Sequence, residues 1–136
     1  MTTKSSILEV QNLRTWLSVG EGLVRAVNGV SFAVGRGETF ALLGESGCGK
    51  SMTALSIARL LPDAGKILSG TVRLDGQDLL QLPESAMREV RGARIGMIFQ
   101  EPGTSLNPVM TVGAQIGEVL LQHTTLSGRA AEARIL

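Results

Sequence analysis

Apolar residues in the first third of the chain recur in short runs of strand length, and glycine-rich turns separate these runs. The predicted strands cover residues 7–10, 23–27 and 30–34. Asn28 and Gly29 divide the second run from the third, and residues 20–22 and 35–37 have the composition of turns. This pattern predicts a β-rich N-terminal region.

The next apolar run, residues 39–43, is also of strand length and precedes a stretch rich in glycine. After that stretch the apolar positions recur at the spacing of a helix until Pro62, which is expected to stop it. The helical positions are Met52, Leu55, Ala58 and Leu61. A strand, a loop and a helix are therefore predicted to follow one another in this part of the chain.

Further strand and helix signals follow Pro62. A strand is predicted over residues 70–74, before the strong turn signal Asp75-Gly76, and a buried strand over residues 94–99. Between them, a helix is expected to begin near Pro83 and to end at Gly92. Strands and helices thus continue to alternate.

Two more helices are expected in the C-terminal part of the sequence. Thr111 provides a cap for the first helix, and Ser127 provides a cap for the second. The first helix is expected to bury Val112, Ile116, Val119 and Leu120. His123 lies on the same helix with no carboxylate or cysteine cluster at metal-binding spacing, which indicates a surface residue.

The composition is that of a globular chain. Its 136 residues suit one domain that buries roughly two-thirds of its unfolded surface. A hydrophobic content of 43% argues against disorder, and a net charge of +1 gives no electrostatic reason to expect a nucleic-acid partner. The only cysteine, Cys48, excludes an internal disulfide framework. No apolar run approaches the roughly 18 residues of a membrane span, and no signal peptide is recognisable, so a cytosolic compartment is the simplest expectation.

Residues 44–51 fit G-x-x-x-x-G-K-[ST], the phosphate-binding loop of nucleotide hydrolases. Glycines let the backbone curl so that several N–H groups face one anion, and the following helix adds the positive end of its dipole. Lys50 brings a full charge to the outer phosphates, and the Ser51 hydroxyl is placed to bind Mg²⁺. The alternative is a glycine-rich turn between two core elements that contains a lysine by accident. The predicted nucleotide-binding residues of the loop are Gly44, Glu45, Ser46, Gly47, Cys48, Gly49, Lys50, Ser51 and Met52.

Two further segments accompany this loop, which has the form Gly-Glu-Ser-Gly-x-Gly-Lys-Ser. They are residues 26–32 and residues 97–113. On these segments the chain resembles the ATPase subunits of ABC transporters, in particular those of dipeptide and oligopeptide importers. Residues 97–113 are the most specific part, because they separate peptide-importer ATPases from other ABC members. The resemblance covers essentially the whole chain.

The resemblance implies an α/β fold, a truncated P-loop NTPase of the ABC ATPase type. Residues 1–136 then form a single incomplete domain. Within it, residues 1–36 are the β-rich subdomain, residues 37–102 the first part of the nucleotide-binding core with its parallel sheet, and residues 103–136 the start of the helical subdomain.

The resemblance also implies roles for residues outside the loop, with ATP and Mg²⁺ as cofactors. Gln100 matches the Q-loop glutamine, which reaches Mg²⁺ and the attacking water, so Lys50 and Gln100 are the implied catalytic residues and Ser51 and Gln100 the implied metal ligands. A polar residue just after a buried parallel strand is also where α/β folds bind ligands. Trp16 matches the aromatic residue that stacks on adenine, and the next position, Leu17, is the alternative match for that family residue.

Several parts of an ABC ATPase do not occur in the sequence. They are the signature segment, the acidic strand with its Mg²⁺-binding Asp and catalytic Glu, and the switch histidine. A truncated product or an incomplete sequence is therefore expected. The implied partners are a second ATPase subunit, as a homodimer or heterodimer, two membrane permease subunits and, indirectly, a solute-binding protein, on the cytoplasmic face of the plasma (inner) membrane.

Three functional hypotheses follow. The first is the ATP-binding subunit of an ABC importer, which couples ATP hydrolysis to uptake of peptides or a related small solute. The second is a nucleotide-binding fragment without turnover. The third is another phosphate-loop protein, such as a small kinase or a non-transport ABC ATPase, against which residues 97–113 argue.

Overall fold

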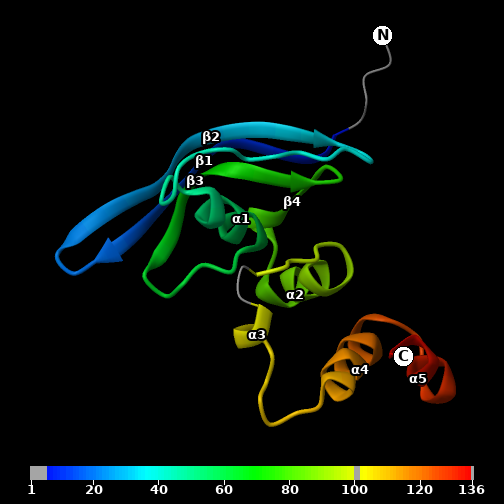
Figure 1. Ribbon diagram of the computed structural model, residues 1–136. Coiled ribbons are helices and arrows are strands. Elements are labelled where there is room, and N and C mark those ends of the chain that lie inside the picture. The colour runs from blue at the N-terminus through cyan, green and yellow to red at the C-terminus, as the bar shows by residue number, and fades with distance from the viewer. Residues whose placement is uncertain (1–5, 100–101, 136) are drawn as a thin grey trace. The chain divides into compact units, whose positions relative to one another are not determined.

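The computed structural model describes residues 6–99 and 102–135. The chain divides into two compact units, Met1–Leu82 and Pro83–Leu136 (Figure 1). The division into residues 1–36, 37–102 and 103–136 that the resemblance implies stays a prediction.

The first unit contains a four-stranded antiparallel sheet in the order β2-β1-β3-β4. Its strands are β1 (Ser6–Val19), β2 (Gly22–Gly35), β3 (Gly65–Leu74) and β4 (Gln77–Asp78). The predicted β-rich region is thus confirmed, but the two strands expected over residues 23–27 and 30–34 form one continuous strand. Gly29 does not end β2, because its positive φ of 77° is accommodated at a register shift. Leu13 pairs with Val30 and Arg14 pairs with Asn28, so Gly29 is an extra residue of β2.

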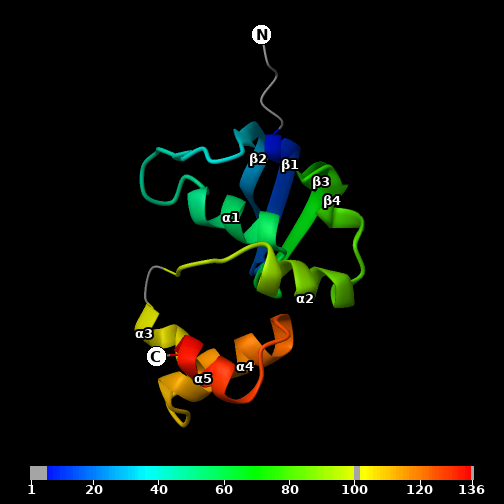
Figure 2. The same ribbon diagram turned by 90° about the vertical axis from the view of Figure 1, so that its right-hand side faces the viewer.

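One helix of this unit, α1 (Lys50–Ala58), contacts both β1 and β2 (Figures 1 and 2). It ends earlier than predicted, because Arg59 adopts a left-handed conformation with φ of 53°. The N–H of Arg59 bonds to the carbonyl oxygen of Ser56, and that of Leu60 to the carbonyl oxygen of Leu55. This C-cap provides hydrogen-bond donors for carbonyl groups of the last helical turn, so the helix ends before Pro62.

The core of the first unit lies where the strands, α1 and the 3₁₀ helix η1 (Leu79–Gln81) meet. Its buried apolar residues are Val10, Leu13, Val27, Ala58, Val72, Leu74 and Leu79. Arg59 joins two of these elements, because its guanidinium donates to the carbonyl oxygens of Leu79 at 3.1 Å and Leu82 at 2.6 Å. The end of α1 is thereby attached to the segment that leaves the sheet.

The predictions of strands over residues 39–43 and 94–99 are wrong. Neither segment forms a strand in the part of the chain that the structure describes, and Leu43 and Ile98 are 91% and 94% exposed. A parallel strand needs a neighbouring strand for its backbone hydrogen bonds, and the sequence does not contain the acidic strand that the resemblance places in this sheet. The first segment is nevertheless held to β2, because the Phe40 ring stacks on the Phe32 ring with centroids 4.9 Å apart and an interplanar angle of 7°.

The second unit is helical and begins with α2 (Glu84–Ala93), close to the predicted bounds. The other helices are α3 (Pro102–Ser105), α4 (Val112–His123) and α5 (Gly128–Ile135). The predicted cap of α4 is confirmed, since the Thr111 side chain accepts a hydrogen bond from the Ala114 N–H at 3.2 Å. His123 is half-buried and its ring lies so close to Gly92 of α2 that a Cβ there would overlap it, so the expectation of a surface residue was wrong.

The burial predicted for α4 was also wrong. Val112 and Val119 are 55% and 54% exposed, and no residue of the helix is fully buried. The helix instead packs against α5 through Gly113 and Gly117, where added Cβ atoms would lie 3.6 Å and 3.5 Å from the Ile135 side chain. Close approach at these glycines turns a different face of α4 toward its neighbour than the apolar spacing predicts.

Candidate nucleotide-binding site

The glycine-rich segment bends into a loop that leads directly into α1. Gly44, Gly47 and Gly49 have φ values of 157°, 81° and 97°. A Cβ on Gly49 would overlap the backbone carbonyl oxygen of Ala26 on β2, and a Cβ on Gly44 would lie 2.5 Å from the Cys48 sulfur. The position of Gly49 therefore requires glycine both for its dihedral angles and for space, because the obstructing atom is backbone. At Gly44 the obstructing atom is the end of the Cys48 side chain, and glycine is favoured by the positive φ.

The Lys50 side chain folds back from the first residue of α1 across this loop. Its Nζ donates to the carbonyl oxygens of Gly44 and Glu45, each at 2.7 Å, and lies 3.6 Å from the Cys48 sulfur. A full positive charge thus lies beside the loop backbone, and an anion bound there would form charge-assisted hydrogen bonds with the ammonium.

The N-terminus of α1 adds to this positive field. Gly49 is the N-cap residue and provides no side-chain cap, and the first turn contains no acidic residue. The first N–H groups and the positive end of the helix dipole therefore face the loop without a carboxylate of that turn to neutralise them. This is the arrangement in which helix N-termini bind phosphate.

The same turn fits a Mg²⁺ ion that is shared with phosphate. The Ser51 side chain is exposed at the second position of α1. Among the residues that the structure describes, no group of three His, Cys, Asp or Glu side chains could hold a metal ion. Mg²⁺ keeps several waters and often binds proteins through one or two side chains plus phosphate oxygens, so one hydroxyl beside a phosphate loop suits its chemistry.

Trp16 has a different setting from the loop residues. The Arg25 guanidinium lies over its ring, 5.2 Å from the centroid, and the Trp16 Nε1 is buried without a hydrogen-bond partner. The residue before it, Thr15, contacts α1 through Ser56, with the two hydroxyl oxygens 2.7 Å apart. The role of Trp16 in adenine stacking stays a prediction.

Gln100 lies outside the described residues, so the structure leaves its implied catalytic and metal-binding roles untested. Cys48 is a free, exposed cysteine within the loop. The structure therefore brings together the predicted residues 44–52 and leaves Trp16 and Gln100 as separate predictions.

Sequence reasoning missed two contacts that support the loop. One is the approach of Gly49 to the Ala26 carbonyl oxygen, and the other is the buried pair of Thr15 and Ser56 hydroxyls. The sequence contains a weak signal for the second contact, because Ser56 follows Met52 by four residues and so lies on the inward face of α1. A polar residue at such a position needs a hydrogen-bond partner.

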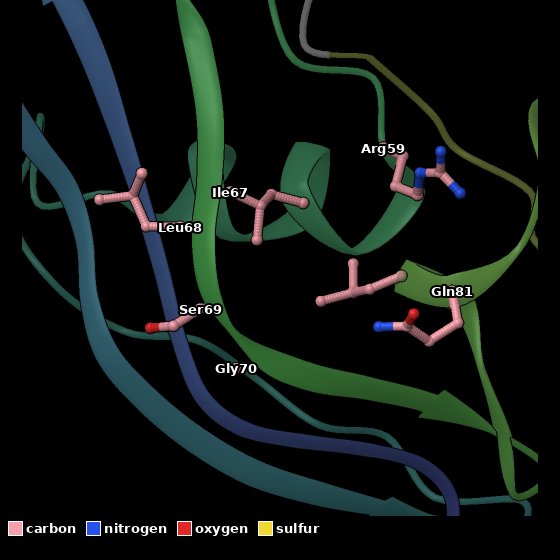
Figure 3. Close-up of a pocket in the computed structure, with 7 residues that line it drawn as sticks. Arg59, Ile67, Leu68, Ser69, Gly70 and Gln81 are labelled. Atoms are coloured by element: carbon pink, nitrogen blue, oxygen red, sulfur yellow. The ribbon is translucent and has the colours of Figure 1, made fainter.

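A separate hollow of the first unit lies between β3 and η1 (Figure 3). Its volume is about 310 Å³, and its lining includes Ile67, Ser69 and Gln81 together with Arg59. None of the predicted site residues lines it. The Arg59 guanidinium at its edge already bonds to two backbone carbonyl oxygens, so this hollow is distinct from the phosphate loop.

Comparison with known proteins assigns the family. The family model described as ABC transporter matches residues 27–135. Over 131 residues the chain is 50% identical to the dipeptide transport ATP-binding protein DppD of Bacillus subtilis (strain 168), a match that covers 96% of this chain and 39% of that protein. It is 47% identical over 131 residues to the oligopeptide transport ATP-binding protein AppD of the same organism, covering 96% of this chain and 40% of the relative.

Solved structures agree with this assignment. The ATP-binding cassette MJ0796, in a dimeric post-hydrolysis state bound to ADP and Pi, matches with a TM-score of 0.81 and 25% identity, over 94% of this chain and 53% of that one. The chain spans about two-fifths of the length of the curated relatives it matches. Among the described residues, no helix is both long enough and apolar enough to cross a membrane. Since the family model covers most of the sequence, this chain belongs to the ABC transporter family.

Proposed function

We propose that the chain is the nucleotide-binding part of an ABC importer ATPase, and that residues 44–51 bind Mg-ATP. The observation that carries this proposal is the position of the Lys50 ammonium beside a loop whose backbone requires glycine at Gly49, at the N-terminus of α1. The names of the relatives support uptake of dipeptides, oligopeptides or a related small solute as the process that hydrolysis drives.

Each part of the loop has a defined task in this proposal. The backbone N–H groups and the N-terminus of α1 bind the β- and γ-phosphates. Lys50 exchanges its bonds to the Gly44 and Glu45 carbonyl oxygens for stronger bonds to phosphate oxygens, because both partners are then charged. Ser51 holds Mg²⁺, which when bound neutralises the charge on the phosphate oxygens. Gln100 orients the attacking water.

We further propose that the 136-residue chain binds nucleotide without turning it over. Phosphoryl transfer depends on positioning and on stabilisation of charge by several groups together. The acidic strand, the signature segment and the switch histidine do not occur in this sequence. Hydrolysis then requires groups beyond Lys50, Ser51 and Gln100.

The proposed partners are a second ATPase subunit, two membrane permease subunits and, indirectly, a solute-binding protein. Two solved structures of the ATP-binding cassette MJ0796 are dimeric, which supports pairing of cassettes. The names of the relatives refer to transport, which supports a peripheral place on the cytoplasmic face of the membrane.

Calorimetry with Mg-ATP, combined with phosphate release in the same buffer, tests this function. We expect binding without phosphate release, and a loss of about ten- to a hundredfold in affinity for Lys50→Ala, because a hydrogen bond to a charged group contributes about 1.5–3 kcal/mol. Lys66→Ala on β3 is the matched control, since it removes the same charge from an exposed strand position. Equal affinity in wild type and Lys50→Ala would overturn the assignment of the loop, and turnover that Lys50→Ala removes would overturn the proposed inactivity.

A further inference from the structure

A buried pair of hydroxyl groups joins α1 to β1. The Thr15 Oγ1 and the Ser56 Oγ are 2.7 Å apart, and both residues are 0% exposed. The Ser56 hydroxyl also donates to the Met52 carbonyl oxygen at 2.6 Å. Because a serine hydroxyl has one proton, Ser56 accepts from Thr15, and the hydrogen bonds run in one direction from Thr15 through Ser56 to Met52.

This pair is important for fixing the position of α1 on the sheet. The buried residues of the helix are Thr53, Ser56 and Ala58, and none of them has a large apolar side chain. Burial of such small side chains gives little free energy and no directional preference. The Thr53 hydroxyl bonds to the Gly49 carbonyl oxygen within the same segment, at 2.9 Å. The Thr15–Ser56 bond is therefore a directional contact between the buried face of α1 and the sheet.

A second contact lies at the phosphate end of the helix. There Gly49 approaches the Ala26 carbonyl oxygen of β2 so closely that no side chain fits between them. Gly49 and Ser56 are seven residues apart, which is about 10 Å along a helix axis. The helix is thus fixed to β2 at its N-terminus and, through the Arg59 guanidinium, to the carbonyl oxygens of Leu79 and Leu82 just beyond its C-terminus. The Ser56 bond lies between these two end contacts and holds the middle of the helix against β1.

We propose that Thr15 is a positioning residue for phosphate binding. Through its hydrogen bond to Ser56 it holds the axis of α1, and with it the N-terminal N–H groups, Lys50 and Ser51, in the orientation that a polyphosphate requires. This inference rests on the proposed nucleotide-binding function. Loss of the bond frees the middle of α1 from β1, which displaces the phosphate-binding groups without removing any of them.

The test compares Thr15→Val with Thr15→Ser. Valine keeps the shape of threonine and removes the hydroxyl, whereas serine keeps the hydroxyl. Thr71→Val is the matched control, because the Thr71 Oγ1 on β3 is buried without a hydrogen-bond partner. Affinities for Mg-ATP and for magnesium tripolyphosphate are measured by calorimetry, and the emission of Trp16, the only tryptophan, follows the fold during urea unfolding.

We expect Thr15→Val to weaken both probes by about five- to twentyfold, as loss of one buried hydrogen bond predicts. Thr15→Ser should stay within about threefold of wild type and Thr71→Val within about twofold, since neither loses a hydrogen bond between elements. Loss of tripolyphosphate affinity together with rescue by serine distinguishes positioning from general destabilisation. If Thr15→Val does not fold, Ser56→Ala breaks the same bond from the helix side, and the same comparison applies.

The outcomes separate the two proposals. A folded Thr15→Val that binds both probes as wild type does, while Lys50→Ala does not, overturns the positioning role and leaves the proposed function in place. A loss that Thr71→Val shares, or that serine does not rescue, also overturns it. A wild-type chain that binds neither probe overturns the proposed function and this inference together.

Discussion

The two compact units differ in the size of their buried apolar cores. In the first, Leu13, Val72 and Leu79 have no exposed surface, and strands, α1 and η1 all contribute to the core. In the second, Met87 reaches the same burial, but α4 has no fully buried residue and exposes Val112 and Val119. The phosphate loop therefore belongs to a unit with its own buried core, whereas α4 has apolar side chains that its own unit does not bury.

Truncation of one side chain in each unit should give the largest difference in the free energy of unfolding. Leu13→Ala is expected to lower the free energy of unfolding by about 2–5 kcal/mol, because a fully buried leucine leaves a cavity. Ile116→Ala on α4 should change it by less than about 0.5 kcal/mol, since that side chain is already partly solvated. Urea unfolding followed by Trp16 emission for the first variant, and by circular dichroism for both, measures the difference. A similar loss for Ile116→Ala would show that α4 is packed as tightly as the sheet.

Two glycines of the loop in the first unit allow a comparison of backbone strain with steric contact. Gly49 and Gly47 both have positive φ, but only Gly49 lies against backbone, while the space around Gly47 is open. Alanine at Gly47 costs about 1–2 kcal/mol of backbone strain, whereas alanine at Gly49 must also move the helix away from β2.

We therefore expect Gly49→Ala to lower Mg-ATP affinity at least tenfold more than Gly47→Ala, which corresponds to about 1.4 kcal/mol. Calorimetry of the two variants under one set of conditions measures this ratio. Equal losses would mean that the contact with Ala26 does not determine the position of the loop.

The smallest expected effect concerns the exposed side of the same loop. Cys48 is accessible, and its sulfur lies 3.6 Å from the Lys50 ammonium. Mg-ATP bound across the loop should cover the thiol and slow its alkylation by about fivefold or more, the protection that roughly 80% occupancy of a single site gives. Mass spectrometry of alkylated protein follows the rate. Lys50→Ala is the control, in which Mg-ATP should give little protection, and equal rates in wild type with and without Mg-ATP would contradict a nucleotide over Cys48.

Local signals made much of this structure predictable. The cap at Thr111, the turn at Asp75-Gly76 and the loop at residues 44–51 depend on neighbours within a few positions, and the sequence contains those neighbours. Strands at residues 39–43 and 94–99 depend on partner strands far away in the chain, so an apolar run alone could not determine them. The continuity of β2 through Gly29 likewise depends on its pairing with β1, which accommodates Gly29 as an extra residue between the partners of Leu13 and Arg14.

The features of the candidate site likewise differed in whether they could be predicted from the sequence. The loop residues were predictable because the motif contains their chemistry. The Thr15–Ser56 bond spans 41 positions and joins a strand to a helix, so it follows only from the three-dimensional arrangement. The prediction of burial on α4 was wrong for a related reason, since the contact of Gly113 and Gly117 with Ile135 depends on a residue of the next helix.

The stack of Phe40 on Phe32 has a consequence for how tightly a ligand is bound. The segment that forms the loop is attached to β2 through Phe32 at one end, and it meets β2 again at Ala26 through Gly49. A chain segment with both ends held has far fewer conformations than a free one, and ordering a residue costs about 1–2 kcal/mol. Most of that entropy is lost when the first unit folds, before any nucleotide arrives. Phosphate therefore meets a loop that is already shaped, and its binding energy goes into affinity instead of into ordering the chain.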